Sequence, residues 1–71
     1  MATLRLTFPT DTGAYVEPND IPATYETEEF IRRFREGLWT LECEKLRRLD
    51  VGQVHDGGGG AMPEWRVTRI D

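Results

Sequence analysis

The chain has 71 residues, a length that accommodates one domain and leaves no room for a second hydrophobic core. A chain this short buries only about 60% of the surface that its unfolded form exposes, which argues against a large enclosed active site. Hydrophobic residues make up 38% and aromatic residues 10% of the sequence, more than a disordered segment normally carries. The sequence therefore predicts a single folded domain over residues 1–71.

Thirteen acidic residues against nine basic ones give a formal charge of −4, so the field of the whole molecule repels phosphate backbones and anionic lipid. The one cysteine, Cys43, excludes an internal disulfide and a zinc ribbon, and it fits a reducing compartment. We find no apolar run as long as a signal peptide or a membrane span. We therefore expect a cytoplasmic protein that does not enter the membrane.

The first predicted element is a strand over residues 3–8, where Leu4, Leu6 and Phe8 alternate with polar residues. Residues 9–13 supply turn formers before a short apolar run at 14–17, which predicts a hairpin. The two prolines that follow, within residues 17–22, predict an exposed loop through which no strand can run.

A helix is predicted over residues 28–37, where Phe30 and Phe34 belong to a set of apolar residues at helical spacing. Thr27 is placed to cap its N-terminus, and Gly37 stands where a left-handed residue ends a helix. The expected surface ion pairs are Glu28 with Arg32 and Glu29 with Arg33.

The segment after this helix is ambiguous. Residues 39–44 alternate with period two, whereas the leucines at 38, 41, 46 and 49 could line one face of a helix. We favour a strand over 39–44, because Gly37 should stop the preceding helix. The stretch 45–49 stays open between strand, helix and irregular structure. A further short strand is predicted over 49–54, with Gly52 as a bulge.

Residues 56–63 contain four consecutive glycines and predict a flexible connection, and residues 64–70 alternate again as a final strand. Together these elements predict an α+β fold. We expect a single two-layer domain in which one α-helix packs on a small antiparallel β-sheet of four to five strands, because each element offers a single apolar face.

No catalytic set emerges from the sequence. The glycine run after His55 lacks the nucleophile elbow of an esterase, since the chain has no serine, and it lacks the Gly-Lys-Ser/Thr of a phosphate loop. A Cys43–His55 dyad oriented by Asp56 is conceivable, but Cys43 is in phase with Trp39 and is expected to be a small buried hydrophobe. The spacing of ligand-type residues predicts no metal site, and we expect no cofactor.

Arginine and tryptophan residues are the best candidates for a binding surface. Arg47 and Arg48 could join arginines of the predicted helix in a local positive patch. Glu42 and Glu44 are expected on a solvated face of the predicted strand. Both tryptophans are expected in the core of so small a domain, and whichever is exposed becomes a hot-spot candidate. The predicted partner-binding residues are Arg32, Arg35, Arg47, Arg48, Trp39 and Trp65.

These features predict a non-enzymatic protein-binding module that inhibits or modulates a larger cytosolic protein by covering its surface. Accessory proteins of phages and mobile elements, such as inhibitors of host defence enzymes, are of this type. One alternative is a nucleic-acid-binding protein that uses the arginine patch with an exposed tryptophan. Another is a self-assembling structural protein, or a homodimer, joined through the open edge of the terminal strand.

Overall fold

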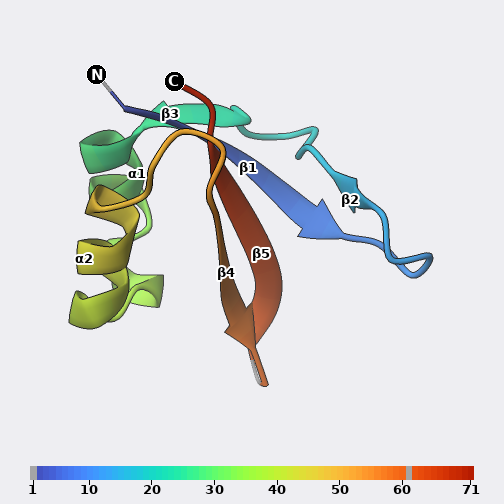
Figure 1. The fold of residues 1–71 in the computed structure, drawn as a ribbon. Coiled ribbons are helices and arrows are strands. Elements are labelled where there is room, and N and C mark those ends of the chain that lie inside the picture. The colour runs from blue at the N-terminus through green and yellow to red at the C-terminus, as the bar shows by residue number, and fades with distance from the viewer. Residues whose placement is uncertain (1, 61) are drawn as a thin grey trace.

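The computed structural model describes residues 2–60 and 62–71, and in them it shows an α+β fold with five strands and two α-helices (Figure 1). In chain order the elements are β1 Thr3–Pro9, β2 Tyr15–Val16, β3 Thr24–Glu26, α1 Thr27–Arg33, the 3₁₀ helix η1 Arg35–Gly37, α2 Thr40–Arg47, β4 Val54–Gly59 and β5 Met62–Arg69. Within the described residues no helix combines the length and the apolar composition that crossing a membrane requires.

All strand pairs in the sheet are antiparallel. The strand order is β2-β1-β5-β4, and β3 pairs with the first half of β1. The terminal strand β5 therefore lies inside the sheet, with Leu6 of β1 opposite its Val67 and with β4 on its other side. The prediction that the terminal strand is the open edge is wrong, because β1 and β4 lie on its two sides, whereas self-assembly itself stays a prediction.

The core lies between the sheet and the two helices, which sit side by side on the left of the sheet in Figure 1. Leu4 and Val67 contribute from the sheet, Phe30 from α1 and Leu46 from α2, and all four side chains are almost fully buried. The alternation of Leu4 and Leu6 thus turned one face of β1 toward the helices, as the sequence predicted.

The structure contradicts the single-helix prediction, because residues 40–47 form the helix α2 and not a strand. Gly37 ends η1 without a positive φ, and the next residue, Leu38, is extended. Trp39 then has the extended backbone of an N-cap, and its carbonyl accepts a hydrogen bond from the Cys43 N–H at 3.0 Å. Gly37 does end the preceding helix, but a new helix can begin three residues later, and the prediction from Gly37 did not consider this.

The predicted helix over 28–37 is confirmed in its core and wrong at its ends. The α-helix runs from Thr27 and gives way to η1. Glu26 is the N-cap and supplies no side-chain hydrogen bond, while the Thr27 side chain is buried inside the first turn. Packing against the core, and not capping, therefore fixes the start of α1.

The first hairpin is confirmed, since Phe8 pairs with Val16 across the turn. The short strand β3 went unpredicted, because three residues are too few for a recognisable alternation. The strand predicted over 49–54 is wrong except at Val54, where β4 begins, and the glycine tract predicted as a connection supplies the second half of β4. Met1 and Ala61, which fall in the predicted N-terminal segment and glycine connection, lie outside the described residues.

Candidate functional site

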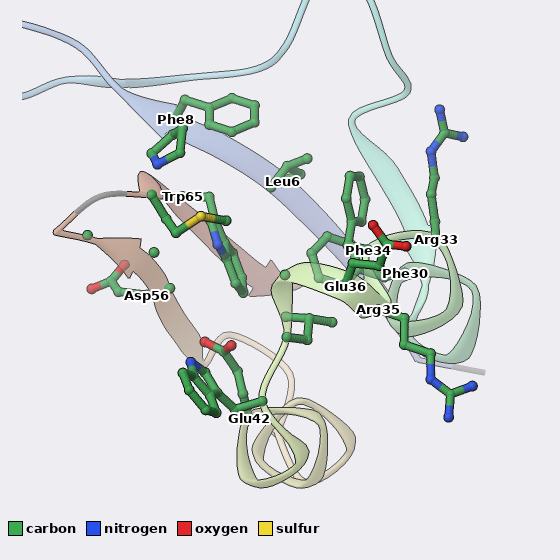
Figure 2. Close-up of a pocket in the computed structure, with 18 of the residues that line it drawn as sticks. Leu6, Phe8, Phe30, Arg33, Phe34, Arg35, Glu36, Glu42, Asp56 and Trp65 are labelled. Atoms are coloured by element: carbon green, nitrogen blue, oxygen red, sulfur yellow. The ribbon is translucent and has the colours of Figure 1, made fainter.

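A groove of about 960 Å³ opens on the helix-bearing side of the sheet, between the α1–η1 segment and the outer half of the β4–β5 hairpin (Figure 2). Its floor is apolar and includes Phe8 of β1, Trp65 of β5 and Phe34 at the end of α1. Arginine and glutamate side chains stand along its rim. The groove is open because the helices are short and cover only part of this face.

The strand β1 extends beyond the part of the sheet that the helices cover. Leu4 and Leu6 are buried beneath the helices, whereas Phe8 is only half-buried although it lies on the same face of the strand. In Figure 1 the far end of β1 runs away from α1 and α2. The alternation that builds the core therefore continues into the groove, where it supplies an apolar floor.

Aromatic rings continue from the core into the groove. The ring centroids of Phe30 and Trp65 are 5.7 Å apart, and those of Phe30 and Phe34 are 4.8 Å apart. Tyr25 meets the Phe34 ring edge-on at 5.7 Å. Such tilted and edge-on contacts favour well-ordered rings. The fully buried Phe30 thus holds the two half-exposed rings in place.

The glycine tract has a structural role on the other wall. Gly57 lies directly opposite Trp65 across the β4–β5 ladder, and a Cβ at Gly57 would overlap the indole ring. Gly58 has a φ of 75°, and a side chain there would overlap the Pro63 carbonyl. Glycine therefore lets the Trp65 ring lie flat against β4 and keeps the hairpin tightly closed beside the groove.

The carboxylates at the β4 wall already accept hydrogen bonds. Glu42 of α2 accepts a hydrogen bond from His55 Nε2 at 2.8 Å, and both side chains are only 14% exposed. On the opposite face of the sheet, Asp56 receives two hydrogen bonds from Arg66, at 2.6 Å and 3.1 Å. The hydrogen bonds from Arg66 lower the pKa of the Asp56 carboxyl from its ordinary value. Arg66 also lies over the Tyr15 ring.

The opposite rim carries three arginines, Arg32, Arg33 and Arg35, that make no ion pair among the described residues. Arg33 stacks over the rings of Tyr25 and Phe34, at 5.6 Å and 6.0 Å from their centroids. Figure 2 shows Arg33 and Arg35 pointing outward from the side of the groove that faces away from Trp65. With Glu36 as the nearby carboxylate, this rim has a positive charge in excess.

Trp39 is 81% exposed and stands between two hollows. It lines the groove, and it also lines a second hollow of about 510 Å³ between the start of α2 and β4. The expectation that Trp39 belongs to the core is wrong, because it precedes the first turn of α2 and makes no part of the buried face. Trp65 is partly buried and packs against the core, so that expectation is confirmed in part.

Four of the six predicted partner-binding residues, Arg32, Arg35, Trp39 and Trp65, line the groove. The other two lie outside both hollows, Arg47 as the last residue of α2 and Arg48 as its C-cap. Arg47 is held there by Glu28 of α1, with distances of 2.9 Å and 3.1 Å, and by Glu44 at 3.4 Å. The hydrogen bonds from Arg47 lower the pKa of the Glu28 carboxyl, and Glu28 thus pairs across the helices and not with Arg32.

The conceivable Cys43–His55–Asp56 arrangement does not form. The His55 side chain is hydrogen-bonded to Glu42, and the Asp56 side chain points to the other face of the sheet because successive strand residues alternate. Cys43 is half-buried against the core. Among residues 2–60 and 62–71 no three side chains of the His, Cys, Asp and Glu types are grouped as a metal site.

Phe8, Phe34, Met62 and Gly57 shape the groove and were not predicted as site residues. Phe8 had a visible signal, since it is the last apolar residue of the first alternation and is followed at once by a turn. The signal for Gly57 was weaker, because it consisted only of a glycine run next to a predicted strand that contains tryptophan. Neither signal shows how far the helices reach along the sheet, which is what opens the groove.

In comparisons with known proteins, no family model, no curated protein and no solved structure matches this chain. The argument for a function therefore depends on the groove and its surroundings.

Proposed function

We propose that this protein is a non-catalytic protein-binding module whose groove receives an apolar segment of a larger partner. The observation that carries the proposal is an aromatic floor, formed by Phe8, Phe34 and Trp65, beside a nearly fully exposed tryptophan. Apolar pockets rimmed by polar residues are typical binding sites, and a volume of about 960 Å³ suits several side chains.

The residues around the groove are of the types that dominate binding energy at protein interfaces. Tryptophan, tyrosine and arginine are enriched among hot-spot residues, because they combine a large contact area with directional polar groups. Trp39 and Arg35 stand on the rim and Trp65 on the floor. A partner that covered all three would remove exposed apolar surface from water.

The charge distribution favours an acidic partner segment. The carboxylates on the β4 side already accept hydrogen bonds from other side chains, whereas Arg32 and Arg35 make no ion pair among the described residues. An acidic residue beside the apolar anchor would gain a charge-assisted hydrogen bond from an arginine at little desolvation cost at the rim. The net charge of −4 opposes acidic partners in general, so the local arginines would confer orientation and selectivity.

In the finer form of the proposal, the protein acts in the cytoplasm as an inhibitor or modulator. By docking the groove on a partner it would mask the partner's substrate or assembly site, as accessory proteins of phages or mobile elements do. Its small size and the lack of an assembled catalytic group in the described residues support occlusion as the mechanism.

Affinity capture with matched variants tests this function. We expect the wild-type protein to retain one stoichiometric protein after nuclease treatment and at moderate salt. The double variant R32A/R35A and the variant W39A should each lose most of it. R48A and V51A are the controls, because Arg48 and Val51 are exposed and line neither hollow. Equal loss with the controls, or no retained protein, would contradict the proposal.

A nucleic-acid-binding function is the second candidate, and the exposure of Trp39 near the unpaired arginines favours it. Base stacking on tryptophan with arginine contacts to phosphate is a common mode for single strands. The same capture discriminates the two. Phosphate binding weakens steeply between about 50 and 200 mM salt, whereas binding through an apolar groove changes little.

A further inference from the structure

The edge of the sheet at β4 is unpaired in the described residues, and its outward backbone groups can be identified. Arg69 of β5 donates its N–H to the Gln53 carbonyl at 3.0 Å and accepts from the Gly52 N–H at 2.7 Å. His55 then lies opposite Val67, two residues farther along. Antiparallel ladders alternate hydrogen-bonded and non-hydrogen-bonded pairs. The N–H and C=O groups of His55 therefore face β5.

By the same alternation, the backbone groups of Val54 and Asp56 point away from the sheet. An open edge of this kind is a template for another extended chain, because its donors and acceptors have no protein partner. The irregularity between Gly57 and Gly59 limits the regular part of the edge to its first half. Residues 54–56 are thus the segment to which a new strand could add.

The second hollow lies along this same segment. It is lined by His55 and Asp56 of β4 and, from the start of α2, by Trp39, Leu41 and Lys45. Leu41 is 76% exposed although it belongs to a helix that packs on the core. An added strand would bring every second side chain to the helix side of the sheet, where Trp39 and Leu41 offer apolar contacts.

A lysine beside the edge has no acidic partner within the described part of the chain. Glu42 is bonded to His55 and Asp56 to Arg66, whereas Lys45 makes no ion pair among the described residues. We propose that an extended, acidic segment of the partner protein adds to the sheet along β4, with alternate apolar side chains on Trp39 and Leu41 and a carboxylate near Lys45. This inference rests on the proposed function and adds a second contact with the same partner, along β4 and the second hollow, beside the segment that the groove receives.

A defined probe tests this mode of binding. The probe is a short synthetic peptide, capped at both ends, in which valine, isoleucine and one glutamate occupy the alternate positions that face the helices, with threonine at the positions between them. A second version carries backbone N-methyl groups on alternate residues, which removes its main-chain donors on one edge. We expect the first peptide to bind the full-length protein and to slow hydrogen exchange of the Asp56 amide, and the methylated peptide to bind at least fivefold more weakly.

Variants of the protein separate the backbone contribution from that of the side chain. V54P removes an outward N–H at an edge position, where proline is tolerated, and V54A keeps the N–H. We expect V54P to bind the peptide about fivefold more weakly than V54A, with unchanged amide spectra elsewhere. The variant L41A should also weaken binding, and a peptide with lysine in place of glutamate should bind less tightly than the acidic one.

Several results would overturn the inference. These are equal binding of V54P and V54A, equal binding of the methylated peptide, an Asp56 amide that exchanges as fast with peptide as without, or a stable dimer that occupies β4 in place of the peptide. The outcome is distinguishable from the test of the proposed function. If R32A/R35A lose the captured partner while V54P keeps it, the groove binds the partner and strand addition is excluded. If V54P loses the captured partner while R32A/R35A keeps it, the partner binds by strand addition at β4 and not in the groove.

Discussion

Leu4 and Phe8 lie on the same face of the same strand, yet Leu4 is fully buried and Phe8 is only half-buried. Leu4 lies under the helices with Phe30 and Leu46, whereas Phe8 lies beyond them, beside Trp65 and the groove. Burial of apolar area is what stabilises a domain this small, so one end of the sheet carries most of the stability. The other end keeps apolar area that a partner could cover.

The same contrast occurs within α2. Its Leu46 is 1% exposed in the core, and its Leu41 is 76% exposed beside β4. Two leucines of one helix thus serve different purposes, one in folding and one in the surface that we propose for binding. Substitutions at matched positions test whether the two regions are as separate as the structure indicates.

The largest effect is expected from Leu46→Ala, which removes a fully buried side chain and leaves a cavity in the core. We expect the free energy of unfolding to fall by about 2–5 kcal/mol. The matched variant Leu41→Ala should change it by less than about 0.5 kcal/mol, because the side chain is in water. Chemical denaturation of both variants measures the difference. Similar losses at the two positions would show that the exposed surface of α2 also supports the fold.

Next in size is Gly57→Ala, in which the new methyl group would collide with the Trp65 ring. We expect a loss of about 1–3 kcal/mol through forced repacking, together with a shift of the tryptophan fluorescence. Gly37→Ala is the control, since its nearest contact would be the Met62 Cε at an ordinary 3.9 Å and its φ is not positive. A stable Gly57→Ala protein with unchanged fluorescence would contradict the proposed role of this glycine.

A smaller effect is expected at the Glu42–His55 contact, which fastens α2 to β4 between the two hollows. Glu42→Ala leaves a half-buried imidazole N–H without its acceptor, so the free energy of unfolding should fall by about 1–2 kcal/mol. Glu44→Ala, in the same helix, removes an exposed carboxylate with one long contact to Arg47 and should have little effect. Thermal unfolding of the two variants at neutral pH compares them, and equal shifts would show that the contact with His55 contributes nothing specific.

The covered end of the molecule was more predictable from the sequence than the open end. The alternation of Leu4 and Leu6 predicted β1 and its buried face, and the spacing of Phe30 and Phe34 predicted α1. Both signals are local periodicities that tertiary packing preserves. The strand predicted over 39–44 was wrong. Leu41 and Cys43 do alternate with polar residues, but the segment is a short helix, and residues two apart in a helix lie on different sides of it.

The sequence predicted the residue types that line the groove but not the position of the groove. Arginine and tryptophan stood out in the sequence, and Arg32, Arg35, Trp39 and Trp65 do line it. Its position depends on where the helices end relative to the sheet and on how closely β4 approaches Trp65. Those are distances between segments far apart in the chain, and no local pattern encodes them. Glu28, expected to pair within its own helix, bonds Arg47 of α2 for the same reason.

The smallest expected effect concerns the open face of the sheet, where Asp56 pairs with Arg66. The hydrogen bonds from Arg66 lower the pKa of Asp56 in the folded protein, below its usual value of 3.8. The unfolded chain therefore binds a proton at higher pH than the folded one. It follows that this pair stabilises the fold fully above pH 3.8, and that the contribution disappears as the pH falls through the lowered pKa.

Asp56→Asn removes that contribution and keeps the size of the side chain. We expect Asp56→Asn to be slightly less stable than the wild type at neutral pH, and the difference to vanish in strong acid, when denaturation is followed as a function of pH. Asp11→Asn is a suitable control, because Asp11 is an exposed turn residue with no ion pair among the described residues. A constant difference across the pH range would mean that Asp56 acts through its shape and not its charge. Asp56 borders both hollows, but its side chain points to the face of the sheet away from the helices and its backbone N–H is unchanged by the substitution. Peptide binding at β4 should therefore survive this substitution even where stability does not.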